Sequence, residues 1–127
     1  FLNGKQITVS KITDLKEASV FLHAGRKPEL WDWGGASYTK LLANAKKTLN
    51  YGGSALDACF VASGRIEANI YGRLNTMDIA SAIGILLEAG GRVVNERGEK
   101  IEFSTVPQKV LMTNNEEIEN VLLKLLF

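Results

Sequence analysis

The sequence has only one cysteine, Cys59, so it cannot form an intrachain disulfide. Chains without disulfides are typical of reducing compartments, and we therefore expect a cytoplasmic protein. No apolar run approaches the roughly 20 residues of a membrane-spanning helix, so we expect no membrane partner. The 15 basic and 14 acidic residues leave a formal net charge of +1, which gives no basic field for nucleic acid. These absences favour a small-molecule partner.

Several catalytic signatures are also missing. The sequence contains no glycine-rich loop followed by Lys-Ser or Lys-Thr, and no Gly-x-Ser-x-Gly elbow. It also lacks His-Glu-x-x-His, paired Cys-x-x-Cys and the glycine pattern of dinucleotide-binding folds. Covalent nucleophiles, zinc sites and nucleotide cofactors are therefore poor hypotheses for this chain.

The pattern that is present predicts one α/β domain. With 127 residues, 46% of them hydrophobic, the chain can bury one core. Apolar spacing predicts a layered sandwich, in which helices flank a mixed β-sheet. We expect a loop over 25–35 and two helices, 54–63 and 76–89, that are apolar on nearly all sides and hence covered on both. The expected strands are 6–10, 18–24, 66–71, 92–95, 101–103 and 110–113, and the other helices are 37–47 and 116–127.

Two glycines precede the helix expected at 54–63. Gly52 and Gly53 would let the backbone approach another group, and free N–H groups at the helix start could bind a ligand's oxygens. The alternative is a capping box, in which Ser54 caps the helix and Asp57 completes the motif. The residues alone leave both interpretations open.

A single carboxylate, Asp78, begins the helix expected at 76–89. The positive end of the helix dipole can stabilise a carboxylate at this position. A bound cation is the alternative, because Mg²⁺ prefers carboxylate oxygens. The only histidine, His23, follows the apolar pair Phe21 and Leu22 and has no acid at ligand spacing, so we interpret it as a packing residue at a strand end.

Taken together, two blocks resemble the inositol monophosphatase family. The first, 52–64, reads GGSALDACFVASG, and the second runs from MDIASA at 77–82 to EAGG at 88–91. Their order and separation also match that family. The resemblance implies the second half of the family's layered α/β sandwich, Mg²⁺ as cofactor and a homodimer. It further implies hydrolysis of a phosphate monoester by metal-activated water.

The resemblance also assigns roles to individual residues. Asp78 corresponds to a catalytic aspartate that is a metal ligand, and Gly53 and Ser54 correspond to backbone contacts with the substrate's alcohol. Met77 stands where tryptophan is usual. Tyr71 stands at a substrate-binding position where several inositol phosphatases have an acidic residue, so fructose 1,6-bisphosphate is as good a candidate substrate as inositol monophosphate.

The rest of the family's metal site does not occur in this sequence. The family supplies an N-terminal glutamate and an Asp-x-x-Asp-Gly segment, and the chain opens with FLNGK, which resembles the hairpin that begins the family's second half. We therefore expect 1–127 to be a single C-terminal domain of a longer phosphatase, inactive alone. The alternatives are a nucleotide 3′-phosphatase of the same superfamily, a non-catalytic sugar-phosphate-binding or regulatory module, and a purely structural domain.

Overall fold

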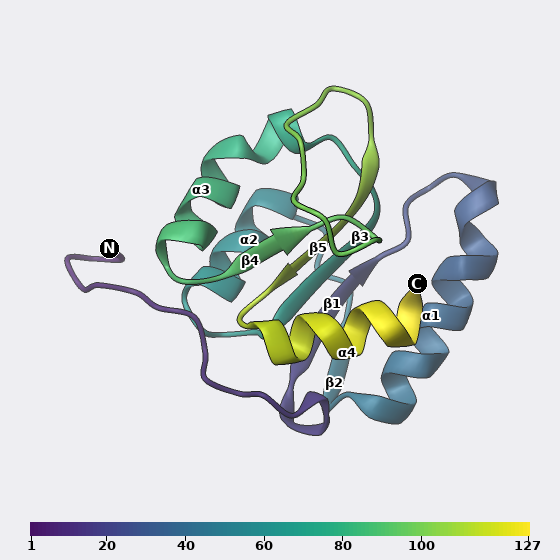
Figure 1. Ribbon diagram of the computed structural model, residues 1–127, viewed down its shortest axis with the longest axis horizontal. Helices are drawn as coiled ribbons and strands as arrows, with labels where there is room; N and C mark the ends of the chain where they lie inside the picture. Colours follow the sequence, from purple (N-terminus) through teal and green to yellow (C-terminus); the bar gives the residue numbers. More distant parts are fainter.

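The protein is described here by a computed structural model of residues 1–127, built around one five-stranded mixed sheet (Figure 1). The strand order is β2-β1-β3-β5-β4. β1 runs parallel to β2 and β3, whereas β5 runs antiparallel to β3 and β4. The predicted α/β sandwich with a mixed sheet is thus confirmed. The strands are β1 (Ser19–His23), β2 (Lys47–Leu49), β3 (Ala68–Leu74), β4 (Arg92–Val94) and β5 (Gln108–Thr113).

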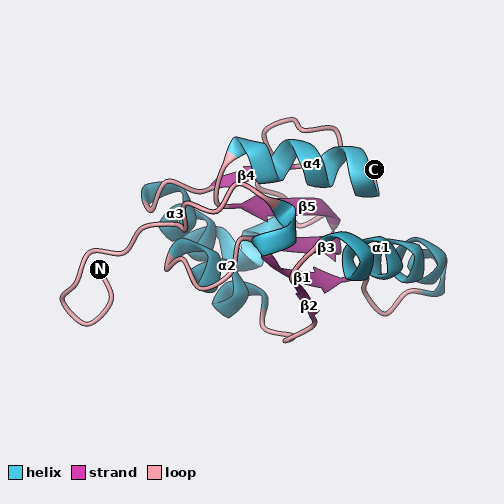
Figure 2. Cartoon of the chain, turned by 90° about the horizontal axis from the view of Figure 1, so that it is seen from below, coloured by secondary structure: helices cyan, strands magenta, loops and turns pink.

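Four helices cover the two faces of this sheet. Figure 2 shows α2 and α3 on one face and α1 and α4 on the other. Short 3₁₀ turns at Leu15–Glu17, Pro28–Leu30 and Thr76–Ile79 connect the elements. The helices are α1 (Trp31–Asn44), α2 (Ser54–Ala62), α3 (Ala80–Glu88) and α4 (Glu116–Leu126).

The core is divided by the sheet into two apolar clusters, because successive side chains of a strand point to opposite faces. Along β5, Val110 and Met112 join the cluster under α2 and α3, while Leu111 joins the cluster under α1 and α4. β1 alternates in the same way, with Phe21 on the first face and Leu22 on the second. Burial on both faces explains why these strands are continuous apolar runs.

The three parallel strands end at the same edge of the sheet. α1 connects β1 to β2 and α2 connects β2 to β3, and both are crossover connections between parallel strands. The carboxyl ends of the three strands therefore lead to His23, to the loop 50–53 and to the segment 75–78, respectively. In open α/β sheets this edge is where ligands bind.

Two predicted strands are wrong. Segment 6–10 lies along the surface, where Ile7 and Val9 pack against the core and one backbone bond joins Val9 N–H to Ala89 O. Segment 101–103 buries Ile101 without joining a ladder. In both segments an apolar side chain is anchored, but no neighbouring strand is available to pair with the backbone.

Helix boundaries also differ from the predictions. The expected loop 25–35 is helical from Trp31, because Pro28 opens a 3₁₀ turn that leads directly into α1. The helix expected at 76–89 begins as the 3₁₀ turn Thr76–Ile79 before it becomes α3. Within this chain α2 and α3 are covered on one side only, and their outer faces expose Leu56, Ile85 and Leu87.

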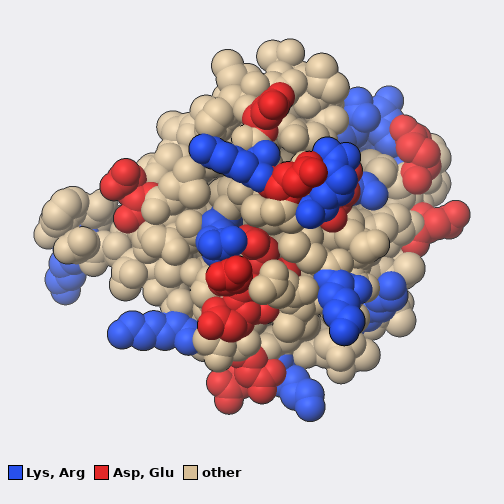
Figure 3. All heavy atoms as spheres, in the orientation of Figure 1, with Lys and Arg blue, Asp and Glu red and all other residues tan.

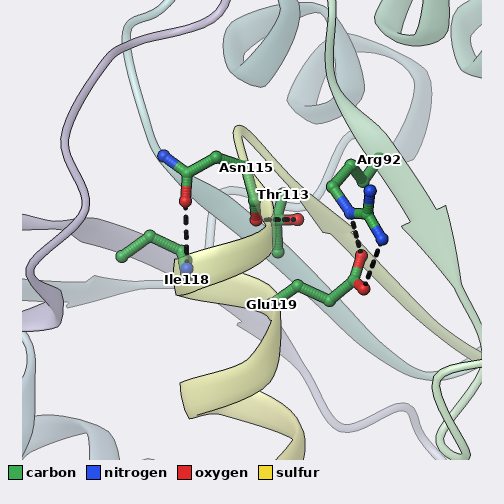
Figure 4. A network of polar contacts seen from close by, with 5 residues as sticks. All are labelled: Arg92, Thr113, Asn115, Ile118 and Glu119. Carbon is green, nitrogen blue, oxygen red and sulfur yellow. Dashed lines mark hydrogen bonds and ion pairs between the residues drawn. The ribbon is translucent and has the colours of Figure 1, made fainter.

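An ion pair with one buried partner fixes α4 against β4 (Figure 4). Arg92 donates from Nε to one oxygen of Glu119 at 2.9 Å and from a terminal nitrogen to the other at 3.0 Å. The Glu119 side chain is only 4% exposed, whereas that of Arg92 is 41% exposed. At the start of the same helix, Asn115 accepts a bond from Ile118 N–H, so α4 is capped as well as paired.

We predict that Arg92→Met destabilises the fold, because it leaves a buried carboxylate without its partner. The partial exposure of Arg92 lowers the expected loss to about 1–3 kcal/mol of unfolding free energy. The double variant Arg92→Met/Glu119→Met should recover most of this loss in urea denaturation. A single variant as stable as the parent chain would show that the pair has no stabilising role.

The surface in Figure 3 carries both signs of charge. Acidic side chains gather over the beginning of α4, where Glu116, Glu117 and Glu119 lie in the first turn and favourably face the helix dipole. Basic side chains are interspersed around them, so this face has no extended field of one sign. None of the helices has the length and apolar character required to cross a membrane.

Candidate functional site

The first part of the candidate site is the start of α2. Gly53 is the N-cap, no side chain caps the helix, and Gly52 has a φ of 96° that glycine adopts without strain. The capping-box alternative is therefore wrong: Ser54 is already the first helical residue, and Asp57 is buried in the protein. The first N–H groups of α2 have no partner within the helix and remain available to a ligand's oxygens.

Asp57 instead belongs to a buried polar cluster, which we call the His–Asp–Tyr cluster (His23, Asp57 and Tyr71). The Asp57 side chain is 0% exposed, and its Oδ2 lies 2.9 Å from His23 Nε2. The Tyr71 hydroxyl donates to the same oxygen at 3.2 Å and accepts a bond from Asn69 Nδ2 at 3.3 Å. The rings of His23 and Tyr71 stack with centroids 4.5 Å apart.

Burial controls protonation in this cluster. It lowers the pKa of His23 below 6.5, and the Asp57 carboxylate and the Asn50 side chain oppose this shift only in part. Burial likewise raises the pKa of the Tyr71 hydroxyl. At neutral pH the cluster therefore holds a neutral imidazole and a neutral phenol. The Tyr71 proton is already used by Asp57, so this hydroxyl has none left to donate to a ligand.

Asp78 lies at the end of β3, in the 3₁₀ turn Thr76–Ile79, and its side chain is exposed. Two side chains, those of Asn75 and Thr76, fix this turn through three hydrogen bonds. The Asn75 side chain accepts a bond from Met77 N–H, and the buried Thr76 hydroxyl donates to Glu102 O at 3.0 Å and accepts from Ser104 N–H at 2.9 Å. A carboxylate that is both exposed and rigidly placed is suited to bind a cation.

The chain holds no group of three or more His, Cys, Asp or Glu side chains that could bind a metal ion together. Asp78 therefore fits a metal site as one ligand of a larger set. A cleft of about 480 Å³ lies between the N-terminal segment and α3 and is not lined by Gly53, Ser54 or Asp78. A cleft without these three residues offers a phosphate ester few groups to bind. The candidate site is therefore placed at the carboxyl edge of the sheet, where Gly53, Ser54 and Asp78 lie.

Comparison with known proteins identifies the family. The family model described as "Inositol monophosphatase family" matches residues 1–126. The chain belongs to the inositol monophosphatase family. It is 34% identical over 106 residues to inositol monophosphatase 2 of Rattus norvegicus, an alignment that covers 81% of this chain and 37% of that protein. It is 30% identical over 131 residues to the fructose-1,6-bisphosphatase of Pyrococcus furiosus, covering 99% and 47% respectively.

Solved structures of the inositol monophosphatase family share the fold described here. An IMPase of Thermotoga maritima superimposes with a TM-score of 0.86 at 27% identity, covering 99% of this chain and 46% of that one. The chain thus spans about half the length of the proteins it matches. The relatives named above are phosphatases acting on inositol phosphates or fructose 1,6-bisphosphate by name.

Three of the residues expected in the site lie at one edge of the sheet. Gly53, Ser54 and Asp78 follow parallel strands whose carboxyl ends share one edge, as a common site requires. Tyr71 lies three residues before the end of β3 and is directly opposite His23, the last residue of β1. Sequence reasoning missed the contact of His23 with Asp57, because the two residues are 34 positions apart and meet only where α2 packs on the sheet.

Proposed function

We propose that this chain supplies Asp78 and the loop around Gly53 and Ser54 to the active site of a Mg²⁺-dependent phosphomonoesterase. The substrates are inositol monophosphate, fructose 1,6-bisphosphate or both. The observation that carries the proposal is the exposed, rigidly held carboxylate of Asp78 at the same sheet edge as the uncapped start of α2, in a chain of the inositol monophosphatase family. When bound, Mg²⁺ supplies an activated water and stabilises the charge of the leaving alcohol.

Each part of the chain has a separate task in this proposal. Asp78 is one of the ligands of the cation. The unpaired N–H groups at the start of α2 bind the oxygens of the substrate's alcohol, an interaction that the positive end of the helix dipole favours. Tyr71, which is buried and bonded to Asp57 in the first turn of α2, takes the substrate-binding position with an aromatic ring instead of an acid in this proposal.

The proposal requires further carboxylates from outside this chain, since one aspartate cannot hold the ions that this chemistry needs. We propose that 1–127 is the C-terminal domain of a longer cytoplasmic enzyme that forms a homodimer. The exposed apolar side chains of Leu56, Ile85 and Leu87 support this assignment, because each is 45–49% exposed and would be buried by an additional layer.

We predict that the 127-residue chain alone releases no phosphate from inositol 1-phosphate above the rate without protein. A single ligand leaves the cation weakly held and the attacking water unactivated. The measurement is a phosphate-release assay with the chain and with the longer gene product that contains it, at equal concentration and with Mg²⁺. Equal rates would show that the residues of this chain are sufficient.

A substrate panel tests the proposed function itself. The longer gene product should hydrolyse inositol 1-phosphate or fructose 1,6-bisphosphate in the presence of Mg²⁺ and lose this activity in EDTA. Release only from nucleotide 3′-phosphates would favour the nucleotide 3′-phosphatase alternative. Binding of these esters without hydrolysis would favour the sugar-phosphate-binding or regulatory module.

A further inference from the structure

The His–Asp–Tyr cluster buries polar groups at a cost in desolvation free energy, which a purely structural role does not explain. Asp57 is fully buried, faces an imidazole instead of a lysine or arginine, and leaves its Oδ1 without a hydrogen-bond partner. The nearby Asn69 Oδ1 is also buried and unpartnered, and His23 Nε2 lies 2.9 Å from Asp57 Oδ2 without the geometry of a hydrogen bond. Apolar residues of similar size would stabilise a core at least as well as such a pair. Buried titratable groups of this kind are concentrated at functional sites.

The cluster also connects the elements that form the candidate site. Asp57 lies in the first turn of α2, three residues after Ser54, and its N–H donates to Gly53 O at 2.8 Å. His23 ends β1, and Tyr71 lies opposite it in β3. A displacement of Asp57 would therefore move the start of α2 relative to the edge of the sheet.

The loop before α2 is held from two sides. On one side the Tyr51 ring stacks on Phe21, with centroids 6.1 Å apart, and meets Phe60 edge to face at 5.8 Å. On the other side the Asn50 side chain lies close to the His23 imidazole and raises its pKa, against the effect of burial. The apolar contacts fix the middle of the loop, and the His–Asp–Tyr cluster fixes its junction with the helix.

We propose that His23 and Asp57 are positioning residues, which hold the N–H groups of Gly53 and Ser54 in the orientation that binds the alcohol of the phosphate ester. This inference rests on the proposed function, because it assigns a role to the same alcohol subsite. His23 acts through Asp57 and does not touch the substrate. The pair therefore affects how tightly a polyol phosphate binds more than how fast its phosphate is released.

If His23 positions the loop, the binding of a polyol phosphate should depend on pH through the charge of the His23 imidazole. The groups that face it are the Asp57 carboxylate from α2, the Tyr71 phenol from β3 and the Asn50 amide from the loop. Since the pKa of His23 is lowered in the folded chain, the neutral form and its stabilisation are complete above about pH 6.5. They are lost as the pH falls from there through the folded pKa. Polyol phosphate binding should weaken in the same range.

The test compares variants of the longer gene product on two esters. Phenyl phosphate has no alcohol hydroxyls for the loop to bind, whereas inositol 1-phosphate has several. We expect Asp57→Asn and His23→Leu to raise the KM for inositol 1-phosphate about five- to tenfold, with kcat and the phenyl phosphate reaction unchanged. His23→Gln keeps an N–H donor near Asp57 and should restore a low KM that no longer depends on pH between 5.5 and 7.

The control is Glu119→Gln, which changes a buried carboxylate under α4, in contact with Arg92 and away from the loop. It should lower thermal stability without changing either KM. The positioning role is contradicted if Asp57→Asn folds cooperatively and leaves the KM for inositol 1-phosphate unchanged, or if it changes both esters equally.

A second readout separates this proposal from the proposed function. If the unaltered gene product hydrolyses none of the esters, the proposed function fails, but the loop can still be followed by NMR. The amide signals of Gly53 and Ser54 should then shift with the titration of the His23 imidazole. They should stop shifting in His23→Gln. Amides that do not respond to this titration would overturn the positioning role.

Discussion

Replacing Asp78 with asparagine is expected to reduce Mg²⁺-dependent phosphate release by the longer gene product by at least about a hundredfold. Asparagine keeps the shape of the side chain and the turn around it, which is held by Asn75 and Thr76. It removes the negative charge that Mg²⁺ requires. The measurement is initial-rate phosphate release over a range of Mg²⁺ concentrations, and we expect both a lower maximal rate and a weaker apparent affinity for the cation.

Asp32→Asn is the matched control for this prediction. Asp32 is an exposed acid in the first turn of α1, so it resembles Asp78 in exposure and in position within its helix. Its replacement should leave the rate and the Mg²⁺ dependence unchanged. If Asp78→Asn and Asp32→Asn behave alike, Asp78 is a helix-start carboxylate stabilised by the dipole and not a metal ligand.

The largest effect on stability is expected from Leu111→Ala in β5, which lies between β3 and β4 in the sheet. Leu111 is 0% exposed and lies between the sheet and the α1 and α4 layer, where truncation leaves a cavity. The expected loss is about 2–5 kcal/mol of unfolding free energy, measured by urea denaturation. Leu42→Ala is the same substitution at a side chain that is 60% exposed, and it should cost less than about 0.5 kcal/mol. Similar losses for both variants would contradict the division of the core described above.

The sequence predicted the elements whose side chains are buried on a regular period. The apolar runs around Val20 and Val110 became β1 and β5, and α4 follows the spacing of Ile118 and Leu122. Segments 6–10 and 101–103 carry similar apolar residues but have no strand beside them. Pairing partners are a property of the tertiary fold, and local spacing cannot supply them.

The candidate site was predictable where it depends on local backbone chemistry. The glycines before α2 and the carboxylate at the start of the second apolar segment can be recognised from neighbouring residues. The role of Asp57 could not, because its spacing from Ser54 also satisfies a capping box. The parallel alignment of β1 with β3 places His23 beside Tyr71, and the packing of α2 on the sheet brings Asp57 to both.

The most direct test of the account is a crystal structure of the longer gene product with Mn²⁺ and inorganic phosphate, in which anomalous scattering locates the metal. We predict a metal ion within coordination distance of an Asp78 carboxylate oxygen, at the edge of the sheet that also carries Gly53 and Ser54. A metal ion bound elsewhere, with Asp78 facing solvent, would contradict the assignment of this chain to the active site.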